Sequence, residues 1–590
     1  MKTLFSAALL LCSSLYLSGQ SGPTWSKKIS PSLLDKTRDG QSTPFIILMR
    51  EQADVSAAAK LDTKEEKGNY VFQTLYQTAE ASQSEVRKLL ENAHITYEPL
   101  YIANLIKTEG DLSLIQSLAQ RSEVALLIDN PTVHFPPPVE WKASDEPSTR
   151  STVEWGIEQI QADAVWALGY RGQDVVVGGE DTGYEWTHPA LKKKYRGYDE
   201  VLDTADHNYN WHDAIHTISP LNSDSLNPCG LNAQAPCDDH GHGTHTMGTM
   251  IGEDGENQIG VAPDAKWCGC RNMERGWGSP FSYLECFQWF LAPTDLNNEN
   301  PDPSKAPHVI NNSWGCPEIE GCDSSNWILL DIAVNNLRQA GTVVIVSAGN
   351  DGPGCSTVQN PAAIFSNSFS IGATARNDTI AGFSSRGAVS VDASNRLKPN
   401  VSAPGVSIRS ARPGGQYGNS SGTSMAGPHV AGLVALIISA NPDLAGKVDL
   451  IEDIIEQTAV PKTTDQSCGD IPGSEVPNNT YGYGRVDALA AVQAAIALIP
   501  TSTQDENVKP VVRVYPNPVD NQLLFATPAN LGDVRLDIYD IQGRLMETHL
   551  WNADAQGITR IDFTEKPAGM YFYSLRSKAG MQAGKVVKKQ

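Results

Sequence analysis

Residues 419–439 read NSSGTSMAGPHVAGLVALIIS and place one serine among small residues, ahead of a long apolar run. Apolar side chains recur at helical spacing along this run and predict a buried helix: Val430, Leu433, Val434, Leu436, Ile437 and Ile438. Ser424 falls at the expected start of that helix, where unpaired N–H groups and the positive end of the helix dipole favour a developing anion. Taken alone, a serine before a core helix is most simply an N-cap. A catalytic interpretation of Ser424 therefore needs partner residues elsewhere.

The 590-residue chain has room for several domains, and its formal net charge is −23. This charge argues against nucleic acid and against an anionic membrane surface as partners. Residues 1–20 resemble a secretory signal peptide, with Lys2 ahead of an apolar run that is too short to span a membrane comfortably. Two later apolar stretches, 424–440 and 486–499, are interrupted by polar residues and predict core helices. We therefore expect an exported protein with no transmembrane segment.

Of the ten cysteines, Cys12 lies in the signal-like segment and the other nine lie between residues 229 and 468. An exported protein with this cysteine content is expected to form disulfides. Two pairs are close enough in sequence to close small loops, Cys229 with Cys237 and Cys316 with Cys322. The odd number leaves at least one thiol unpaired. The Cys-Gly-Cys spacing at 268–270 does not match usual zinc-ligand spacing, so we expect no zinc site there.

Residues 21–140 are expected to form a small α+β domain, because strand and helix patterns alternate along them. The expected strands are 45–49, 97–108 and 124–128, and the expected helices are 69–93 and 112–118. Residues 136–152 are rich in Pro, Ser, Asp and Glu and predict an exposed linker that a protease can cut.

A different pattern begins at Trp155, where short apolar runs bounded by Gly, Pro or polar residues alternate with helical stretches. The runs are 174–178, 265–271, 308–313, 342–347 and 369–372. For residues 150–500 this predicts an α/β fold, a mostly parallel sheet with helices on both faces and its chemistry at the carboxyl ends of the strands. Residues 501–510 are a polar linker, and residues 511–590 alternate with period two, which predicts a small β-sandwich.

Four polar residues at separate points of the α/β region make up the inventory for acyl transfer. Asp181 follows a strand, within Glu-Asp-Thr-Gly, and can orient a histidine. His242 lies in the run DHGHGTH at 239–245, where Gly243 keeps the backbone clear for an imidazole. Asn350 ends a buried strand beside a glycine and supplies an amide donor. Ser424 supplies the nucleophile.

In these residues the chain resembles the subtilisin-like serine proteases, or subtilases. The order Asp181, His242, Ser424 is the order of that family. Four signatures agree: DTG at 181–183, HGTH at 242–245, AGN at 348–350 and GTSMAGPHVAG at 422–432. The resemblance covers roughly residues 153–498, and the segment 281–314 is most similar to the bacillopeptidase F-type branch.

The resemblance implies a secreted serine endopeptidase. Ser424 would attack the peptide carbonyl, His242 would transfer the proton, Asp181 would hold the imidazole and Asn350 would bind the oxyanion. Two strand ends would pair with an extended protein or peptide substrate: Ser313, Trp314 and Gly315 on one side, and Ser347, Ala348 and Gly349 on the other. No cofactor is required. Structural calcium is common in the family, although the sequence shows no contiguous calcium-ligand loop.

The chain departs from the family pattern at a few positions. Glu180 stands where an aliphatic residue is usual, and we expect its side chain to point to the face of the sheet opposite Asp181. Thr246 and Met247 replace the usual small apolar pair after HGTH. Asp351 follows Asn350 and is expected near the rim of the first specificity pocket. Glycine-lined walls suggest room for a large side chain, so we expect a broad pocket that prefers large apolar residues and tolerates Lys or Arg through Asp351.

Two other classes of function remain open. His240, His242 and His245 form an H-x-H-x-x-H pattern that superficially resembles the metal site of metallo-β-lactamase-type hydrolases. In that site an Asp normally precedes the last His, and here the residue is Thr244. The alternatives to the protease are therefore a metal-dependent hydrolase and a catalytically silent surface scaffold.

Both ends of the chain agree with the subtilase resemblance. Residues 44–135 resemble the inhibitor prodomain of the family, which chaperones folding and plugs the cleft until it is cut away. The tail resembles the C-terminal sorting domain of type IX secretion at four points: 514–518, 539–544, 567–571 and 585–588. A carbohydrate-binding or adhesive sandwich is the alternative for the tail. The resemblance implies the type IX secretion machinery as a partner and a location in the medium or on the outer cell surface.

Overall fold

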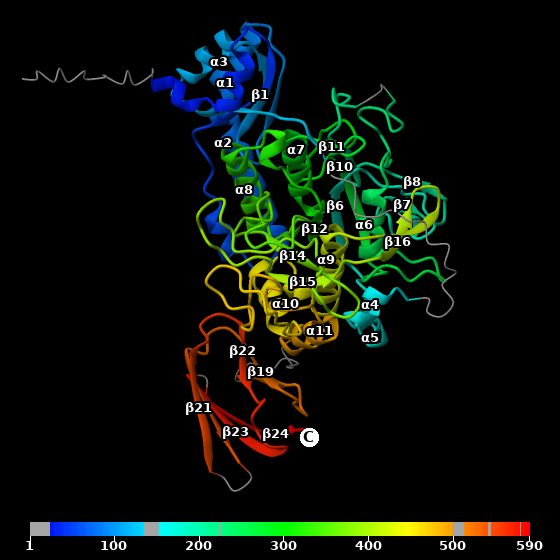
Figure 1. The fold of residues 1–590 in the computed structure, drawn as a ribbon, viewed down its shortest axis with the longest axis vertical. Coiled ribbons are helices and arrows are strands. Elements are labelled where there is room, and N and C mark those ends of the chain that lie inside the picture. Colours follow the sequence, from blue (N-terminus) through cyan, green and yellow to red (C-terminus); the bar gives the residue numbers. More distant parts are fainter. Residues whose placement is uncertain are drawn as a thin grey trace, which may run out of the picture.

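The computed structural model describes residues 24–134, 153–222, 226–499, 512–540, 544–578 and 580–589. Figure 1 shows three parts along the longest axis, with an N-terminal domain at one end, a large central domain, and a β-rich tail at the other end. The expected signal peptide at 1–20 and the expected linkers at 136–152 and 501–510 lie outside the described residues.

The N-terminal domain is an antiparallel sheet of four strands in the order β2-β3-β1-β4, with helices on one face. Its elements are α1 (Pro31–Thr37), β1 (Thr43–Met49), α2 (Lys64–Asn92), β2 (Tyr97–Leu100), β3 (Leu105–Gly110), α3 (Leu112–Ala119) and β4 (Val124–Asp129). Alternate side chains of β1 divide between two cores. Phe45 and Ile47 pack within the domain, whereas Ile46 and Leu48 join a core shared with the central domain.

The single strand expected at residues 97–108 is wrong, because the chain turns at 101–104 and forms the β2–β3 hairpin. The turn residues Ile102 and Ala103 are fully buried, which gave this stretch the apolar pattern of a strand. Their burial comes from docking. The Tyr101 N–H donates to Gln288 Oε1 of the central domain at 2.6 Å, and Asn336 Nδ2 donates to the Ile102 carbonyl at 2.7 Å.

The central domain is built on a sheet of seven strands in the order β15-β14-β13-β12-β6-β10-β9, and every neighbouring pair is parallel. The strands are β6 (Val176–Asp181), β9 (Trp211–Asp213), β10 (Lys266–Arg271), β12 (Val309–Asn312), β13 (Val343–Ser347), β14 (Phe369–Thr374) and β15 (Val401–Pro404). Five of them match the predicted apolar runs within a few residues. The two edge strands β9 and β15 are short and were not predicted.

Helices cover both faces of this sheet (Figure 1). On one face α7 (Pro280–Leu291) and α8 (Ser324–Gln339) pack together with the N-terminal domain. The other face holds α4 (Trp155–Gln159), α5 (Ala162–Ala167), α6 (His242–Ile251), α9 (Thr423–Ala440), α10 (Val448–Thr458) and α11 (Ala488–Ala497). Short pairs outside the sheet are β5 (Val133–His134) with β11 (Trp277–Gly278), β7 (Tyr198–Asp199) with β8 (Thr204–Ala205), and β16 (Ile408–Arg412) with β17 (Gln416–Ser420). The prediction of an α/β fold with helices on both faces is therefore confirmed.

The predicted core helix at 424–440 corresponds to α9. Among the described helices, α9 alone is long and apolar enough to cross a membrane by length and composition, but 94% of it is buried inside the protein. Its apolar residues fill the central core between the sheet and α6. This burial explains why the run carries almost no polar side chain.

Four disulfides cross-link the central domain: Cys229–Cys237, Cys270–Cys286, Cys316–Cys322 and Cys355–Cys468. The first and third are the pairs that short sequence spacing predicted. The second joins β10 to α7, and the fourth joins loops 113 residues apart, so only the fold reveals them. Cys268 is the unpaired thiol among the described residues, and it is buried.

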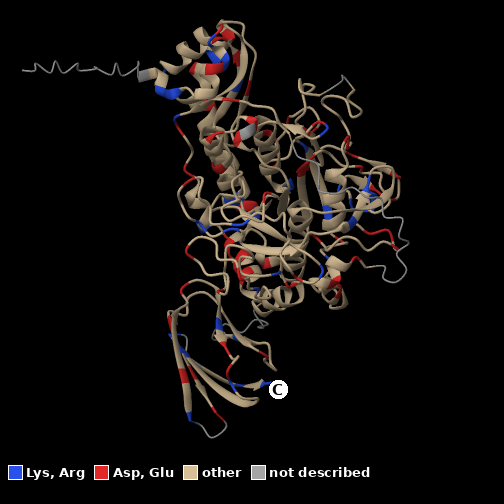
Figure 2. Cartoon of the chain, in the orientation of Figure 1, with Lys and Arg blue, Asp and Glu red and all other residues tan. Residues whose placement is uncertain are grey.

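The tail consists of two antiparallel sheets, β18-β19-β22 and β21-β20-β23-β24, around a core of its own. The strands are β18 (Arg513–Tyr515), β19 (Gln522–Thr527), β20 (Asp533–Tyr539), β21 (Leu545–Asn552), β22 (Gly557–Asp562), β23 (Gly569–Ser577) and β24 (Gly580–Lys588). β18 and β22 contact α11 and α10 of the central domain. Figure 2 shows the acidic residues spread over all three parts of the molecule, which fits a solvated acidic surface.

Candidate active site

The first two predicted catalytic residues meet at the end of β6. Asp181 is the last residue of that strand, and His242 is the first residue of α6. His242 Nδ1 lies 2.7 Å from Asp181 Oδ1, and both side chains are almost fully buried. The Thr182 N–H also donates to Asp181 Oδ1, at 2.8 Å. An ionised carboxylate only accepts hydrogen bonds, so this contact places a proton on Nδ1 and directs Nε2 away from Asp181.

Asp238 holds this arrangement, and sequence analysis missed it. Its Oδ1 accepts from Thr182 Oγ1 at 2.9 Å and from the N–H groups of residues 240 and 241, and its Oδ2 accepts from the Thr244 N–H and hydroxyl. One carboxylate thus satisfies unpaired N–H groups at the start of α6 and ties that helix to the turn after β6. An Asp a few residues before a helix is a capping signal, so the position of Asp238 ahead of the 242–251 helix could have indicated this role from the sequence.

Gly243 allows α6 to approach β6 closely. A Cβ built on Gly243 would lie 2.1 Å from the Gly183 carbonyl oxygen and 3.0 Å from Asp181 Cβ. Any larger residue would push the helix, and His242 with it, away from Asp181. Thr246, which stands where the family usually has a small apolar residue, also contacts Asp181. Its hydroxyl lies 3.2 Å from Asp181 Oδ2 and 3.0 Å from the Gly243 carbonyl oxygen.

The predicted nucleophile and oxyanion donor meet at the start of α9. Ser424 is the second residue of the helix and is 3% exposed. Asn350 Oδ1 accepts hydrogen bonds from the Thr423 N–H and hydroxyl, both at 2.9 Å, which fixes the orientation of the amide. A Cβ built on Gly422 would lie 3.6 Å from Asn350 Nδ2 and 3.6 Å from Ser424 N. The side-chain amide of Asn350 and the backbone N–H of Ser424 are therefore both close to the space beside Gly422.

The predicted substrate-binding residues lie at the ends of two neighbouring strands of the sheet. Residues 313–315 directly follow β12, and residues 347–349 start at the last residue of β13. Ser347 Oγ lies 3.2 Å from Ser313 Oγ, and the Ser313 hydroxyl lies 3.4 Å from the Ser424 carbonyl oxygen. Gly349 has a φ of +105°, a left-handed conformation that a glycine adopts without strain. Trp314 is 4% exposed as a whole residue, and its indole N–H is directed inward to Glu180.

A further strand edge borders the site and has no motif in the sequence. β11 pairs antiparallel with β5, with Trp277 opposite His134 and Gly278 opposite Val133. The His134 N–H also donates to Glu320 Oε2 at 2.9 Å, and the rings of His134 and Trp277 are 4.2 Å apart between centroids. The chain leaving the N-terminal domain therefore runs as an extended strand along the central domain.

Two of the three histidines of the alternative metal site use a ring nitrogen for a protein hydrogen bond, and the three do not form a metal-ligand group among the described residues. His242 Nδ1 is engaged by Asp181, as described above. His245 Nε2 lies 3.1 Å from the carbonyl oxygens of both Ile408 and Gly418, and burial holds the pKa of His245 well below its usual value. An imidazole N–H directed at two carbonyls is not available as a metal ligand through that nitrogen.

Glu180 lies on the opposite face of β6 from Asp181, as predicted. Its Oε1 accepts a hydrogen bond from Trp314 Nε1 at 2.8 Å, and no described residue forms a hydrogen bond with its Oε2. Complete burial, together with the neighbouring Asp181 charge, holds the pKa of Glu180 well above its usual value. The protonated form of Glu180 is therefore favoured over a wider pH range than in an exposed Glu, which reduces its negative charge beside Asp181.

The raised pKa of Glu180 predicts a pH-dependent cost to stability. Above the usual Glu pKa the unfolded chain releases a proton that the folded chain retains, so the free energy of unfolding falls as pH rises. Glu180→Gln removes this dependence. We expect the variant's gain in free energy of unfolding over wild type to grow as pH rises above the usual Glu pKa of about 4.3. Urea unfolding of both chains in an inactive background measures it, and a difference independent of pH would contradict a raised pKa of Glu180.

Comparison with known proteins identifies two regions. The sequence model of the subtilase family matches residues 172–484, and that of the secretion system C-terminal sorting domain matches residues 513–589. Bacillopeptidase F from Bacillus subtilis (strain 168) is 37% identical over 80% of this chain, but the chain spans only 33% of that protein. Subtilisin Savinase from Lederbergia lenta is 31% identical over 58% of this chain and 99% of its own length. Alkaline protease from Alkalihalobacillus alcalophilus is 30% identical over 58% of this chain and 70% of its own length.

The sorting domain is that of type IX secretion and identifies the protein as exported, to the medium or to the outer cell surface. The family match extends over more than half of the chain and includes every predicted catalytic position. The chain therefore belongs to the subtilase family, the subtilisin-like serine endopeptidases.

Proposed function

We propose that the chain is the precursor of a secreted endopeptidase that hydrolyses peptide bonds in proteins through Asp181, His242 and Ser424. One observation carries the proposal: the 2.7 Å contact between Asp181 and His242 at the carboxyl end of the inner strand β6, with Ser424 in the first turn of the buried helix α9. The arrangement has a base, a group that orients it, and a nucleophile with small neighbours. Metal-dependent hydrolysis is a weaker candidate, because His242 and His245 each use a ring nitrogen for a protein hydrogen bond.

In the proposed reaction His242 Nε2 accepts the proton of Ser424 Oγ as that oxygen attacks the substrate carbonyl. Asp181 accepts the Nδ1 proton and stabilises the imidazolium that forms. The imidazolium then gives its proton to the leaving amine, and an acyl-enzyme remains. Water repeats the sequence and releases the acid. All these groups belong to the chain, so no step draws on a cofactor.

Oxyanion binding is assigned to Asn350 Nδ2 and the Ser424 N–H. The negative charge on the former carbonyl oxygen needs donors that are already oriented, since reorientation during the reaction would cost energy. The two hydrogen bonds from Thr423 to Asn350 Oδ1 supply that orientation. The positive end of the α9 dipole adds to the same effect.

We propose that residues 21–140 form an inhibitor prodomain and residues 150–500 the peptidase domain. The N-terminal domain shares a hydrophobic core with α7 and α8, so it is docked rather than tethered. Its outgoing strand β5 occupies the edge of β11, where an extended substrate would add a strand. Removal of this strand would open the edge for substrate.

Specificity is proposed to favour large apolar side chains, with Lys or Arg tolerated. Asp351 Oδ2 lies 3.6 Å from the position of a Cβ on Gly349, which supports a carboxylate near the glycine-lined wall. Partial desolvation raises the pKa of Asp351. A carboxylate at this point would repel acidic residues at the cleaved position.

A fluorophosphonate probe tests the proposed chemistry directly, because it forms a covalent bond with an activated serine. After removal of the N-terminal domain, we expect one adduct per chain, mapped by peptide mass spectrometry to Ser424. The intact precursor is the control and should label slowly while the N-terminal domain covers the site. An adduct at another serine, or inactivation by a zinc chelator that added zinc reverses, would contradict the proposal.

A further inference from the structure

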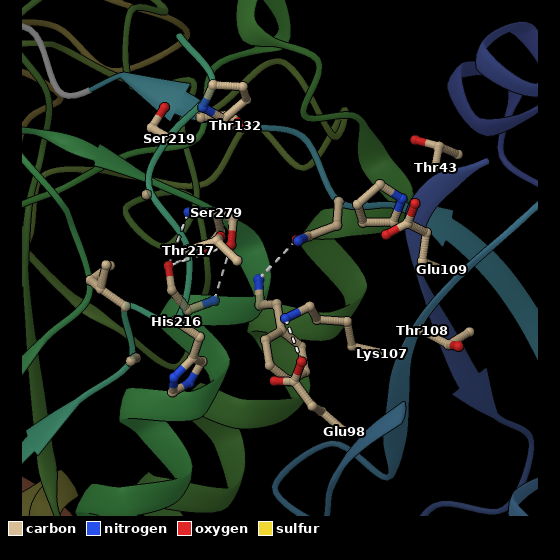
Figure 3. A pocket seen from close by; sticks show the side chains of 18 of the residues that line it. Thr43, Glu98, Lys107, Thr108, Glu109, Thr132, His216, Thr217, Ser219 and Ser279 are labelled. Atoms are coloured by element: carbon tan, nitrogen blue, oxygen red, sulfur yellow. Dashed lines mark hydrogen bonds and ion pairs between the residues drawn. The ribbon is translucent and has the colours of Figure 1, made fainter. Parts of the chain in front are cut away.

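A cavity of about 440 Å³ lies at the junction of the N-terminal and central domains. On one side it is lined by β2 and β3, and on the other by residues 214–220 and the start of α7. Figure 3 shows Glu98 and His216 on facing sides of this cavity, with Lys107 beside Glu98. The cavity lies apart from the proposed catalytic residues, none of which lines it.

Metal-ligating side chains from both domains converge beside the cavity. One ligand atom from each of Glu98, His216 and Glu285 lies within 4.8 Å of the other two. His216 Nε2 lies 2.9 and 3.0 Å from the two carboxylate oxygens of Glu285. His212 Nε2 lies 2.8 Å from Glu285 Oε1 and brings a second imidazole to the group.

The surroundings orient these ligands. His216 Nδ1 lies 2.5 Å from Asn232 Oδ1, an acceptor that holds a proton on Nδ1, and Nε2, which donates to Glu285 here, is the nitrogen that would give up its proton to bind a metal. The side chain of Glu285 is 12% exposed and that of His216 is 26% exposed, whereas Glu98 is exposed at the rim, so the site is shielded on the side of the central domain and reachable from solvent at Glu98. Partly buried imidazoles and carboxylates with one imidazole nitrogen fixed by a second partner are typical of zinc-binding sites.

We propose that Glu98, His216 and Glu285 bind one divalent transition-metal cation of the zinc class, which bridges the two domains, while His212 orients Glu285 through its 2.8 Å contact. Imidazole ligands favour zinc and its neighbours over calcium and magnesium, which prefer oxygen alone. Ligands about 2.1 Å from one tetrahedral ion lie about 3.4 Å apart, so atoms that are within 4.8 Å of one another must approach by up to about 1.4 Å. Glu98 would also exchange its ion pair with Lys107, now at 2.8 Å, for the metal.

The bridge would stabilise docking of the N-terminal domain. Two ligands, His216 and Glu285, belong to the central domain, and Glu98 belongs to β2 of the N-terminal domain. The complete site therefore exists only while the two domains are docked. A ligand that binds the docked state more tightly shifts the equilibrium toward it. Release of the cleaved N-terminal domain is then expected to be slower in the presence of the cation.

The test uses the full-length chain carrying Ser424→Ala, so that self-cleavage cannot remove the N-terminal domain. The chain is stripped of metal and titrated with Zn²⁺ against a chromogenic chelator, and Ca²⁺ and Mg²⁺ serve as comparison ions. We expect one equivalent of bound Zn²⁺ and a rise in the unfolding temperature. His216→Ala and Glu285→Gln should abolish both effects, and Glu98→Gln should weaken binding by about tenfold or more. Glu109→Gln is the matched control, since Glu109 lines the same cavity outside the ligand group.

Three results would overturn the proposal. Absence of stoichiometric Zn²⁺ binding would mean that the cluster is an ion pair between histidine and glutamate only. Binding that survives both His216→Ala and Glu285→Gln would place the metal elsewhere. Equal affinity in Glu98→Gln and wild type would show that the metal does not bridge the domains. Because the readouts are metal binding and thermal unfolding, none of these results depends on the proposed protease mechanism.

Discussion

Ser424→Ala is expected to abolish peptide-bond hydrolysis and to leave the N-terminal domain attached to the chain. Without Oγ no acyl-enzyme can form, and loss of the nucleophile in a serine protease costs on the order of 10⁶-fold in turnover. Attachment of the N-terminal domain follows if the enzyme cuts its own linker. Turnover of a peptide substrate measures the first effect, and N-terminal sequencing of the purified chain measures the second.

Ser439→Ala provides the matched control for this experiment. Ser439 lies near the other end of α9 and donates a hydrogen bond to Gln173 Oε1 at 2.9 Å, away from the site. Its loss should leave turnover and processing intact. Residual turnover within about tenfold of wild type in Ser424→Ala would exclude Ser424 as the nucleophile. If the Ser424→Ala variant is inactive but still loses its N-terminal domain normally, another protease must cut the linker.

The sequence predicted the parts of the site that depend on short-range patterns. Glu180 and Asp181 are adjacent in a strand, so their opposite directions follow from the period of two. Ser424 precedes an apolar run with helical spacing, and that run became α9. The orientation of Asn350 was not predictable, because Thr423, which holds it, is 73 residues away in the chain.

Features created by docking of the two domains were not predictable from any one stretch. Val133 and His134 show no motif, and their role becomes visible only where they pair with Trp277 and Gly278. The same holds for Glu98 and Glu285, which lie on different domains and share no spacing pattern. The β2–β3 turn misled the strand prediction because its apolar residues are buried by another domain. Burial between domains and burial within one leave the same pattern in a sequence.

Asp181→Asn is expected to lower turnover by about 10⁴-fold while substrate binding changes little. The uncharged amide can no longer stabilise the imidazolium of His242 as the proton leaves Ser424. If the amide N–H faces Nδ1, it also holds the histidine proton on Nε2, where it blocks acceptance from the serine. Steady-state kinetics should therefore show a fall in kcat with KM nearly unchanged. A large rise in KM at constant kcat would instead indicate a distorted substrate cleft.

Glu180→Gln separates the role of Asp181 from any general effect of removing a carboxyl group from β6. The two residues are adjacent, equally buried and similar in chemistry, but their side chains occupy opposite faces of the sheet. Gln retains the acceptor for Trp314 Nε1, and burial already favours the uncharged form of Glu180 because it raises the pKa of that carboxyl, so the substitution disturbs the charge near His242 little. Turnover of Glu180→Gln should stay close to that of wild type. A comparable loss in both variants would mean that the end of β6 supports the site through packing, and would remove the specific electrostatic role from Asp181.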